Sequence, residues 1–440
     1  MRCGRRGSTH PTPLLLLLDV LRDLKRVMPE SDFVIPLTSR AIVAPIVLML
    51  EGDRKSRSTT LAVLQSLDLS RGAMALFVFL SHAAILTGSI PNLGIFFILG
   101  AVAVDVFMFI SGFLMLWNYE EREAKEPWDK PSTWRQFWVR RFLRIAPLYW
   151  AALALVYLLH EPLTAWHLKI GEMYPPPWGA GSSDPRIDDT LNVPSVLAHY
   201  SFAFGLIPKW ASSNQLPDWS IGLEMQFYLC FPFLALAVRK LKWAMAALAI
   251  TAIWRISVHQ ISIGLNAPGG AWGWYPMPTL LPLRLGIFLC GMLAAARLRR
   301  VDKTAIVAPA CLCALSLALW HSKHLALFVF AFLGWEIVLR LWNRADLIGW
   351  MLKLGVGFLS LRVVKFVADC SYGLYLLHSP IQLGSIWLLS RSNLLTEMEP
   401  AIRFAALILV SLPASLFAAW SCHRWIELPG IRLGKALAAR

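Results

Sequence analysis

Long apolar runs separated by short polar or charged segments dominate the pattern of this chain. A helix needs about 20 apolar residues to cross the hydrocarbon core of a bilayer, and several runs reach or approach that length. A spanning helix also satisfies its own backbone hydrogen bonds, which lipid cannot do. The pattern therefore predicts an all-α polytopic membrane protein, a bundle of about ten transmembrane helices, with spans near residues 68–88, 95–117, 144–160, 219–238, 243–262, 280–297, 304–320, 324–341, 370–390 and 402–422.

Composition and charge agree with this interpretation. Hydrophobic residues make up 57% of the chain and its mean hydropathy is +0.55, which excludes an ordinary soluble domain. The formal charge of +15 does not indicate a nucleic-acid partner, because no basic patch is interleaved with exposed aromatic residues. Basic residues gather instead in alternate loops, so the positive-inside rule predicts an inner (plasma) membrane protein with both ends of its core in the cytoplasm. The loops concerned contain Arg135, Arg140, Arg141 and Arg144, then Arg239, Lys240 and Lys242, then Arg297, Arg299, Arg300 and Lys303, then Arg344, Lys353, Arg362 and Lys365.

The chain divides into an N-terminal extension, residues 1–61, and a membrane-embedded domain, residues 62–437. The extension contains an amphipathic stretch, Pro13–Val27, and an apolar stretch with two prolines and an arginine, Phe33–Leu50. Two alternatives remain open for it: translation begins at Met49, or Phe33–Leu50 crosses the membrane. No small-residue cleavage site follows the apolar stretch, so a signal peptide fits poorly.

No metal site is expected from the cysteines. The seven of them lie in or beside apolar spans and form neither a CxxC nor a Cys/His spacing, so packing is the expected role of Cys3, Cys230, Cys290, Cys311, Cys313, Cys370 and Cys422.

Arg71 and His82 stand out as two polar residues on one apolar segment, SRGAMALFVFLSHAAI. Their spacing of eleven residues is about three helical turns, which puts both side chains on one face about 16 Å apart. Ionisable groups inside a membrane usually face a bundle interior or a water-filled cavity and indicate a functional site. The alternative is a snorkelling arginine and a hydrogen-bonded core histidine.

The segment that carries this pair resembles the opening motif of the acyltransferase type 3 family of integral membrane O-acyltransferases. Members of that family have Asp, Arg-Gly and then His, as Asp68, Arg71, Gly72 and His82 do in SLDLSRGAMALFVFLSHA. Further similar motifs follow in family order over about residues 62–437: VDVFMFISGFLM, RRFLRIAPLYW, WSIGLEMQFYLCFP, RLGIFLCGMLAA, SYGLYLLHSP and HRWIELP.

The resemblance implies transfer of an acyl group, often acetyl in this family, from cytoplasmic acyl-CoA to a hydroxyl of a sugar, a surface polysaccharide of the cell envelope or a lipid-linked glycan. Such O-acetylation needs a base for the hydroxyl proton, and the neutral imidazole of His82 suits that role. Alternatively, His82 takes the acyl group itself. Guanidinium groups bind phosphate bidentately, so Arg71, Arg141 and Arg144 are candidates for holding the CoA phosphates. The competing interpretation makes Arg140, Arg141 and Arg144 lipid headgroup anchors.

Further polar residues in the spans are weighed between function and packing. Glu224 is expected to orient the His82 imidazole or bind the acceptor hydroxyl, or else to form an ion pair that joins two helices. Asp105 and His378 are substrate or relay candidates with a packing alternative each. Trp219 and Ser220 accompany Glu224 in its motif and belong to the same candidate group.

The segment Glu161–Pro217 is predicted to be a long outer loop with one surface helix, 194–207, and its tryptophans either cover an acceptor site or anchor in the headgroup region. A different class of function stays open beside the enzyme: a proton-coupled secondary transporter that uses the same buried charged residues as its path.

Overall fold

A computed structural model describes residues 64–173, 191–211, 213–240, 279–299, 362–391 and 398–439, with isolated positions between 246 and 257. All of these lie in one compact unit, Ala62–Arg440. The predicted extension 1–61 and the predicted spans 304–320 and 324–341 lie outside the described residues, as does nearly all of 243–262.

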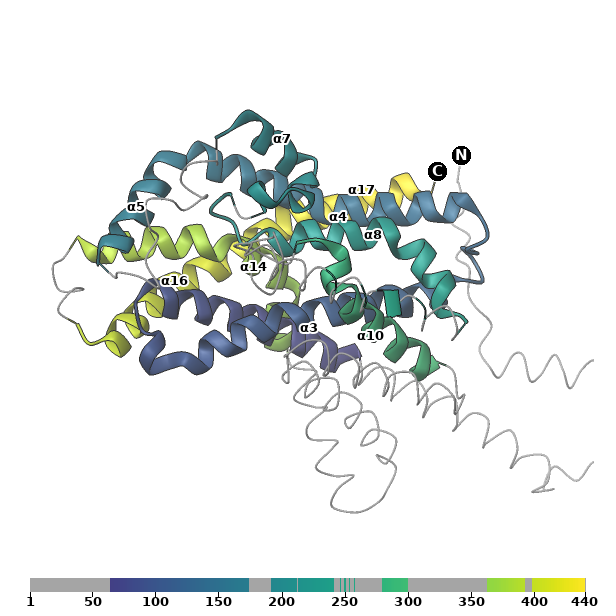
Figure 1. Ribbon diagram of the computed structural model, residues 1–440, viewed down its shortest axis with the longest axis horizontal. Helices are drawn as coiled ribbons and strands as arrows, with labels where there is room; N and C mark the ends of the chain where they lie inside the picture. Colours follow the sequence, from purple (N-terminus) through teal and green to yellow (C-terminus); the bar gives the residue numbers. More distant parts are fainter. Residues whose placement is uncertain are drawn as a thin grey trace, which may run out of the picture. The chain divides into compact units, whose positions relative to one another are not determined.

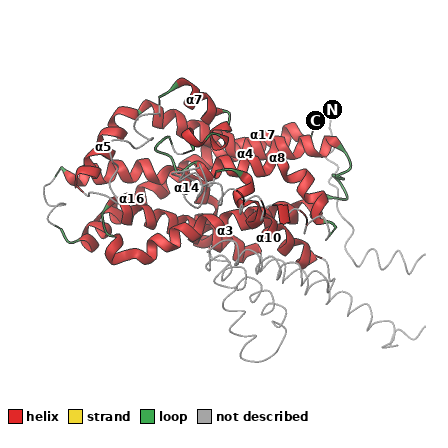
Figure 2. Ribbon diagram, viewed as in Figure 1, coloured by secondary structure: helices red, strands yellow, loops and turns green. Residues whose placement is uncertain are grey.

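The described part of the chain is helical and contains no strand (Figures 1 and 2). Five of its helices are long and apolar enough to cross a membrane, so the chain is a multi-pass membrane protein with the bilayer as its environment. The predicted all-α class is confirmed. The elements are Leu64–Leu86, α3 (Ile90–Arg122), α4 (Pro131–Leu158), α5 (His160–Met173), α7 (Val193–Tyr200), η2 (Ala203–Leu206), η3 (Pro208–Trp210), α8 (Trp219–Val238), α10 (Leu281–Arg299), α14 (Arg362–Ser390), α16 (Pro400–Cys422), η6 (His423–Glu427) and α17 (Leu428–Ala438).

The predicted spans that lie within the described residues fall on helices, but these helices extend beyond the apolar runs, and the count of ten spans stays a prediction. The run 144–160 is the second half of α4, which begins at Pro131, so Arg135, Arg140 and Arg141 are helical rather than in a loop. Proline favours the first helical position, and arginine and glutamine are good helix formers although they are not apolar. Hydropathy detects only the apolar part of such a helix.

The described parts of the outer segment Glu161–Pro217, residues 161–173, 191–211 and 213–217, contain several helices where the sequence predicts a long loop. The segment begins within α5, where Leu163, His167 and Ile170 are buried at the spacing of one helix face. The predicted surface helix 194–207 is α7 followed by η2, and the two are separated at Phe202, whose φ of 62° lies in the left-handed region. A left-handed residue ends an α-helix, so the apolar pattern continues while the helix does not.

Extensive packing joins α3 to α10, α14 to α16 and α4 to α17. Gly112 of α3 and Gly291 of α10 allow the first pair to approach closely, because a Cβ at either position would overlap the backbone carbonyl of Phe288 or of Phe109. Close approach through small residues is how helices associate in a membrane, where burial of apolar surface supplies little driving force.

The pair α4 and α17 meets at a proline. Pro147 lacks an N–H, so the carbonyl of Leu143 one turn earlier loses its helical donor. Gly430 of α17 lies against that carbonyl, and a Cβ there would come within 2.5 Å of the oxygen. This contact holds α17 along the half of α4 that carries the arginines (Figure 1).

Candidate active site

A cavity opens between helix Leu64–Leu86, α3, α4, α8 and α14, and its lining combines charged, hydroxyl and apolar side chains. Its empty space, including the part open to solvent, is about 860 Å³. The polar side chains that line it are those of Arg71, Ser111, Asn118, Arg141, Arg144, Ser220, Glu224, Tyr228, Ser371, Tyr372 and Tyr375.

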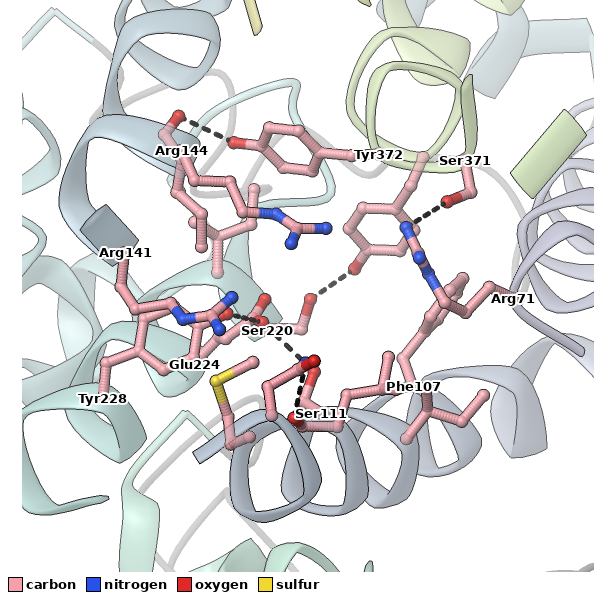
Figure 3. A pocket seen from close by; sticks show the side chains of 17 residues that line it. Arg71, Phe107, Ser111, Arg141, Arg144, Ser220, Glu224, Tyr228, Ser371 and Tyr372 are labelled. Carbon is pink, nitrogen blue, oxygen red and sulfur yellow. Dashed lines mark hydrogen bonds between the residues drawn. The ribbon is translucent and has the colours of Figure 1, made fainter. Parts of the chain in front are cut away.

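Three guanidinium groups reach this cavity from two helices, Arg71 from Leu64–Leu86 and Arg141 and Arg144 from α4. Figure 3 shows them approaching one open space from different sides. Arg141 lies over the rings of Phe137 and Tyr228, 5.7 and 5.9 Å from their centroids. Within the described residues, Arg144 makes no hydrogen bond or ion pair, and Arg71 has one carboxylate nearby, Asp68 at 3.6 Å. The lining therefore has a surplus of positive charge.

Arg140 differs from its two neighbours in the motif. Its Nη1 and Nη2 donate to the two carboxylate oxygens of Glu126, at 3.1 and 2.6 Å, and it does not line the cavity. A bidentate pair of this kind occupies the whole fork of the guanidinium. The motif RRFLR thus separates into one arginine that joins helix α4 to the preceding loop and two that face the cavity.

Glu224 is the single carboxylate among the described residues that line the cavity. Its Oε1 accepts a hydrogen bond from the hydroxyl of Ser111, at 3.1 Å, and another from the hydroxyl of Tyr228. Its hydrogen-bond partners are these hydroxyls and not His82. No hydrogen bond joins Glu224 and His82 in the described part of the chain, so the expectation that Glu224 orients the His82 imidazole stays a prediction.

Helix α14 forms another wall of the cavity, with Ser371, Tyr372 and Tyr375 in its lining. Nη2 of Arg71 donates to the hydroxyl of Ser371 and to the carbonyl of Ala368, both at 3.4 Å. One turn farther along, the hydroxyls of Tyr375 and Ser220 lie 2.7 Å apart, which connects α14 to the first turn of α8. Ser220 lines the cavity, whereas its neighbour Trp219 packs against the hydrophobic core.

His82 and His378 meet next to this wall. Nδ1 of His82 lies 3.1 Å from Nε2 of His378 and 3.0 Å from the carbonyl oxygen of Val78. Arg71 and His82 therefore both face α14, as their eleven-residue spacing predicts. Neither histidine lines the cavity itself; Tyr375, one turn before His378, does.

Asp105 lies outside the lining of the cavity. It forms a buried ion pair with Arg284 of α10. A charge that is buried with an opposite partner between two helices stabilises their relative position, which is the packing alternative considered for this residue.

A second buried polar cluster precedes α8. Asp218, at the N-cap of that helix, accepts hydrogen bonds from the hydroxyl of Tyr149 at 2.7 Å and from the amide of Asn214 at 2.8 Å. Nε2 of His199 lies 3.7 Å from the same carboxylate. Burial raises the pKa of Asp218 above its usual range, against the opposing effect of His199 and the two donors. The cluster fixes the start of the helix that carries Ser220 and Glu224.

Sequence reasoning missed several lining residues that helical spacing identifies. Tyr228 follows Glu224 by four residues and Tyr375 follows Tyr372 by three, so each pair shares a helix face. Ser111 has no such signal, because its partner Glu224 lies on another helix. No group of three or more His, Cys, Asp or Glu side chains in the described ranges is arranged to hold a metal ion.

Comparison with known proteins gives two matches. The family model Acyl_transf_3, described as an acyltransferase domain, covers residues 64–420. The acyltransferase MdmB of Streptomyces mycarofaciens is 29% identical over 160 residues, which are 35% of this chain and 35% of that protein. The matching segment thus spans about a third of the length of this curated relative. No solved structure matches.

Proposed function

The chain belongs to the acyltransferase type 3 family, whose model matches residues 64–420, and from that premise we propose that it is a membrane O-acyltransferase. The proposed reaction moves an acyl group, acetyl in its simplest form, from cytoplasmic acyl-CoA to a hydroxyl of a sugar, a surface polysaccharide or a related acceptor. The observation that carries the proposal is the convergence of Arg71, Arg141 and Arg144 on one cavity.

The three arginines are proposed to hold the phosphates of the donor. Two of them line the cavity without a carboxylate partner in the described residues, and the third has one at 3.6 Å. Guanidinium groups whose charge is not balanced by a carboxylate attract a ligand with several negative charges. Their planar arrangement of N–H donors also matches the geometry of phosphate oxygens. Because the basic loops are expected in the cytoplasm, acyl-CoA would enter from that side.

The position of His82 suits the reacting end of the same donor. Arg71 and His82 lie on one helix about 16 Å apart along its axis, taking 1.5 Å per residue. A donor whose phosphates bind at Arg71 can extend its pantetheine arm along this helix toward His82. The imidazole then takes the proton from the acceptor hydroxyl as the hydroxyl oxygen attacks the thioester carbonyl.

Glu224 is proposed to bind the acceptor. Its Oε1 already accepts two hydroxyl hydrogen bonds, so its Oε2 is the atom placed to accept a third from a substrate hydroxyl. The apolar part of the lining, formed by Phe107, Ile110, Leu114, Met115, Ile145 and Ile221, supplies a low-polarity surface for the acyl chain and the arm of the donor.

The test is release of free CoA by the purified, detergent-solubilised protein, given a panel of acyl-CoA donors with sugars and envelope glycans. We expect CoA release that depends on an acceptor and is lost in His82→Ala and Arg71→Ala. Arg140→Ala is the matched control for Arg141→Ala and Arg144→Ala, because it removes a guanidinium of the same helix that does not line the cavity.

Full activity of His82→Ala would remove the proposed base. Equal losses in Arg140→Ala and Arg144→Ala would indicate that α4 needs positive charge in general rather than a phosphate site. No release with any donor and acceptor, in protein shown to be folded by its thermal unfolding, would favour a proton-coupled transporter that uses the same residues.

A further inference from the structure

A partly exposed imidazole and a buried one, His82 and His378, meet where helix Leu64–Leu86 packs against α14, one turn beyond the cavity wall. Nε2 of His378 lies 3.1 Å from Nδ1 of His82, and the ring centroids are 4.8 Å apart. The side chain of His378 is fully buried. Such a pair has a definite arrangement of protons, because a neutral imidazole has one nitrogen that donates and one that accepts.

The proton of His378 is fixed by its own helix. Its Nδ1 lies 2.7 Å from the carbonyl oxygen of Tyr375 and 3.2 Å from that of Leu374. Carbonyl oxygens only accept hydrogen bonds, so Nδ1 carries the hydrogen. In a neutral ring, Nε2 of His378 then presents a lone pair toward His82. A second proton would place a full charge at a site with no exposed surface, which costs free energy unless an anion compensates it.

The proton of His82 follows from the same reasoning. Its Nδ1 faces the carbonyl oxygen of Val78 at 3.0 Å and the lone pair of His378 Nε2. Both neighbours accept, so Nδ1 of His82 must donate. If Nδ1 of His82 carried no hydrogen, its lone pair would face the lone pairs of the Val78 carbonyl oxygen and of His378 Nε2, which is unfavourable. The lone pair of His82 therefore belongs to Nε2, the nitrogen on the opposite side of the ring.

We propose that His378 is a positioning residue that holds His82 in the tautomer in which Nε2 is the base. The inference rests on the proposed acyl transfer and deepens it. As the acceptor oxygen bonds to the thioester carbon, its proton moves to Nε2 of His82. When the C–S bond breaks, the leaving thiolate takes that proton, and His82 returns to its neutral form. Throughout, Nδ1–H of His82 stays bonded to His378, and this bond is strongest while His82 carries the positive charge.

The first measurement is the tautomer itself, which does not depend on activity. The ring nitrogens of ¹⁵N-histidine-labelled protein are observed by NMR, and His82 is assigned as the signal lost in His82→Gln. We expect its Nδ1 to be protonated and its Nε2 to be unprotonated. A protonated Nε2 with an unprotonated Nδ1 would overturn the proposal.

The second measurement compares two substitutions of His378. Glutamine keeps an acceptor atom near the position of Nε2, whereas leucine removes it. His378→Leu is expected to lower kcat at least about tenfold with the KM for acyl-CoA unchanged, because the base loses its orienting partner. His378→Gln is expected to keep kcat within about threefold of the wild-type value.

Gln382→Met is the matched structural control. Gln382 is buried on α14 one turn after His378, and its amide donates to the carbonyl of Phe79 at 2.9 Å, so it joins the same two helices without a hydrogen bond to either imidazole. We expect wild-type kcat from Gln382→Met.

Three kinetic outcomes would overturn the proposal. Unchanged kcat in His378→Leu would mean that His82 needs no partner. Equal inactivity of folded His378→Gln and His378→Leu would mean that the second imidazole transfers a proton itself. An equal loss in Gln382→Met would assign the effect to helix packing. Should the wild-type protein transfer no acyl group, the tautomer measurement still decides the geometry of the pair, and the proposed function alone would fail.

Discussion

Asp105 of α3 and Arg284 of α10 form a buried ion pair across the helix pair in which Gly112 and Gly291 bring the two backbones together. The glycines allow the helices to approach, and the ion pair specifies their register, because a buried carboxylate without its cation is costly. Helix α3 also carries Ser111, which donates to Glu224, so this packing positions one wall of the candidate active site.

The first prediction concerns this ion pair. Asp105→Asn should lower the free energy of unfolding by about 3–5 kcal/mol, because it removes the negative charge that is buried beside the guanidinium of Arg284. The double variant Asp105→Asn/Arg284→Met should be more stable than Asp105→Asn alone. Thermal unfolding in detergent measures both. A stable Asp105→Asn that has lost acyl transfer would contradict the packing role and restore Asp105 as a relay residue.

The second prediction concerns the glycines at the same crossing. Gly291→Ala should destabilise the protein by about 1–3 kcal/mol or more, because its Cβ would overlap the carbonyl of Phe109 and the backbones must separate. Gly384→Ala is the control, since its Cβ would meet the ring of Trp166 at 3.2 Å, and that side chain can shift. Equal stability of the two variants would show that α3 and α10 pack less closely than described.

Sequence reasoning predicted the family, the all-α class and most of the described helices. The family and the class are confirmed by the match over residues 64–420 and by the absence of strands from the described ranges. The elements it predicted wrongly, the start of α4 and the helix α5, lie where helices continue outside the apolar runs. The predicted surface helix 194–207 exists as α7, but it ends earlier, at Tyr200. Hydropathy detects only the part of a helix that matches the apolar core of the membrane. Residues beyond that part can still have a high helix propensity, so the helix extends farther than the apolar run.

The sequence predicts only part of the candidate active site, and the physical reason is the difference between spacing within one helix and contacts between helices. Arg71, Arg141 and Arg144 were proposed as a group from one helix spacing and one motif, and the structure brings them to one cavity. Which carboxylate pairs with which donor depends on contacts between helices that no spacing within a helix specifies. Glu224 with Ser111 and Asp105 with Arg284 are both of this kind.

The third prediction tests the geometry of the phosphate site rather than its charge. Arg144→Lys keeps a positive charge but loses the planar fork, so the KM for acyl-CoA should rise at least about tenfold while the protein stays folded. Arg140→Lys should leave the KM for the donor unchanged, since Arg140 binds Glu126 outside the cavity. Initial rates of CoA release at varied donor concentration measure both. An unchanged KM in Arg144→Lys would leave charge alone as the role of this residue.

The fourth prediction separates the two possible roles of Glu224. Glu224→Gln keeps an oxygen that accepts from Ser111 and Tyr228 but removes the negative charge, so helix packing through these bonds should survive. If the carboxylate binds the acceptor, kcat/KM for the acceptor should fall at least about tenfold with the melting temperature almost unchanged.

Tyr228→Phe is the matched variant for this test. It removes a donor to the same Oε1 and leaves the carboxylate in place, so it should affect kcat/KM for the acceptor less than Glu224→Gln does. Unchanged kinetics in Glu224→Gln would assign the residue to packing between α3 and α8. A large fall in melting temperature with normal kinetics per folded molecule would lead to the same assignment, because a carboxylate that only joins two helices acts on stability and not on the reaction.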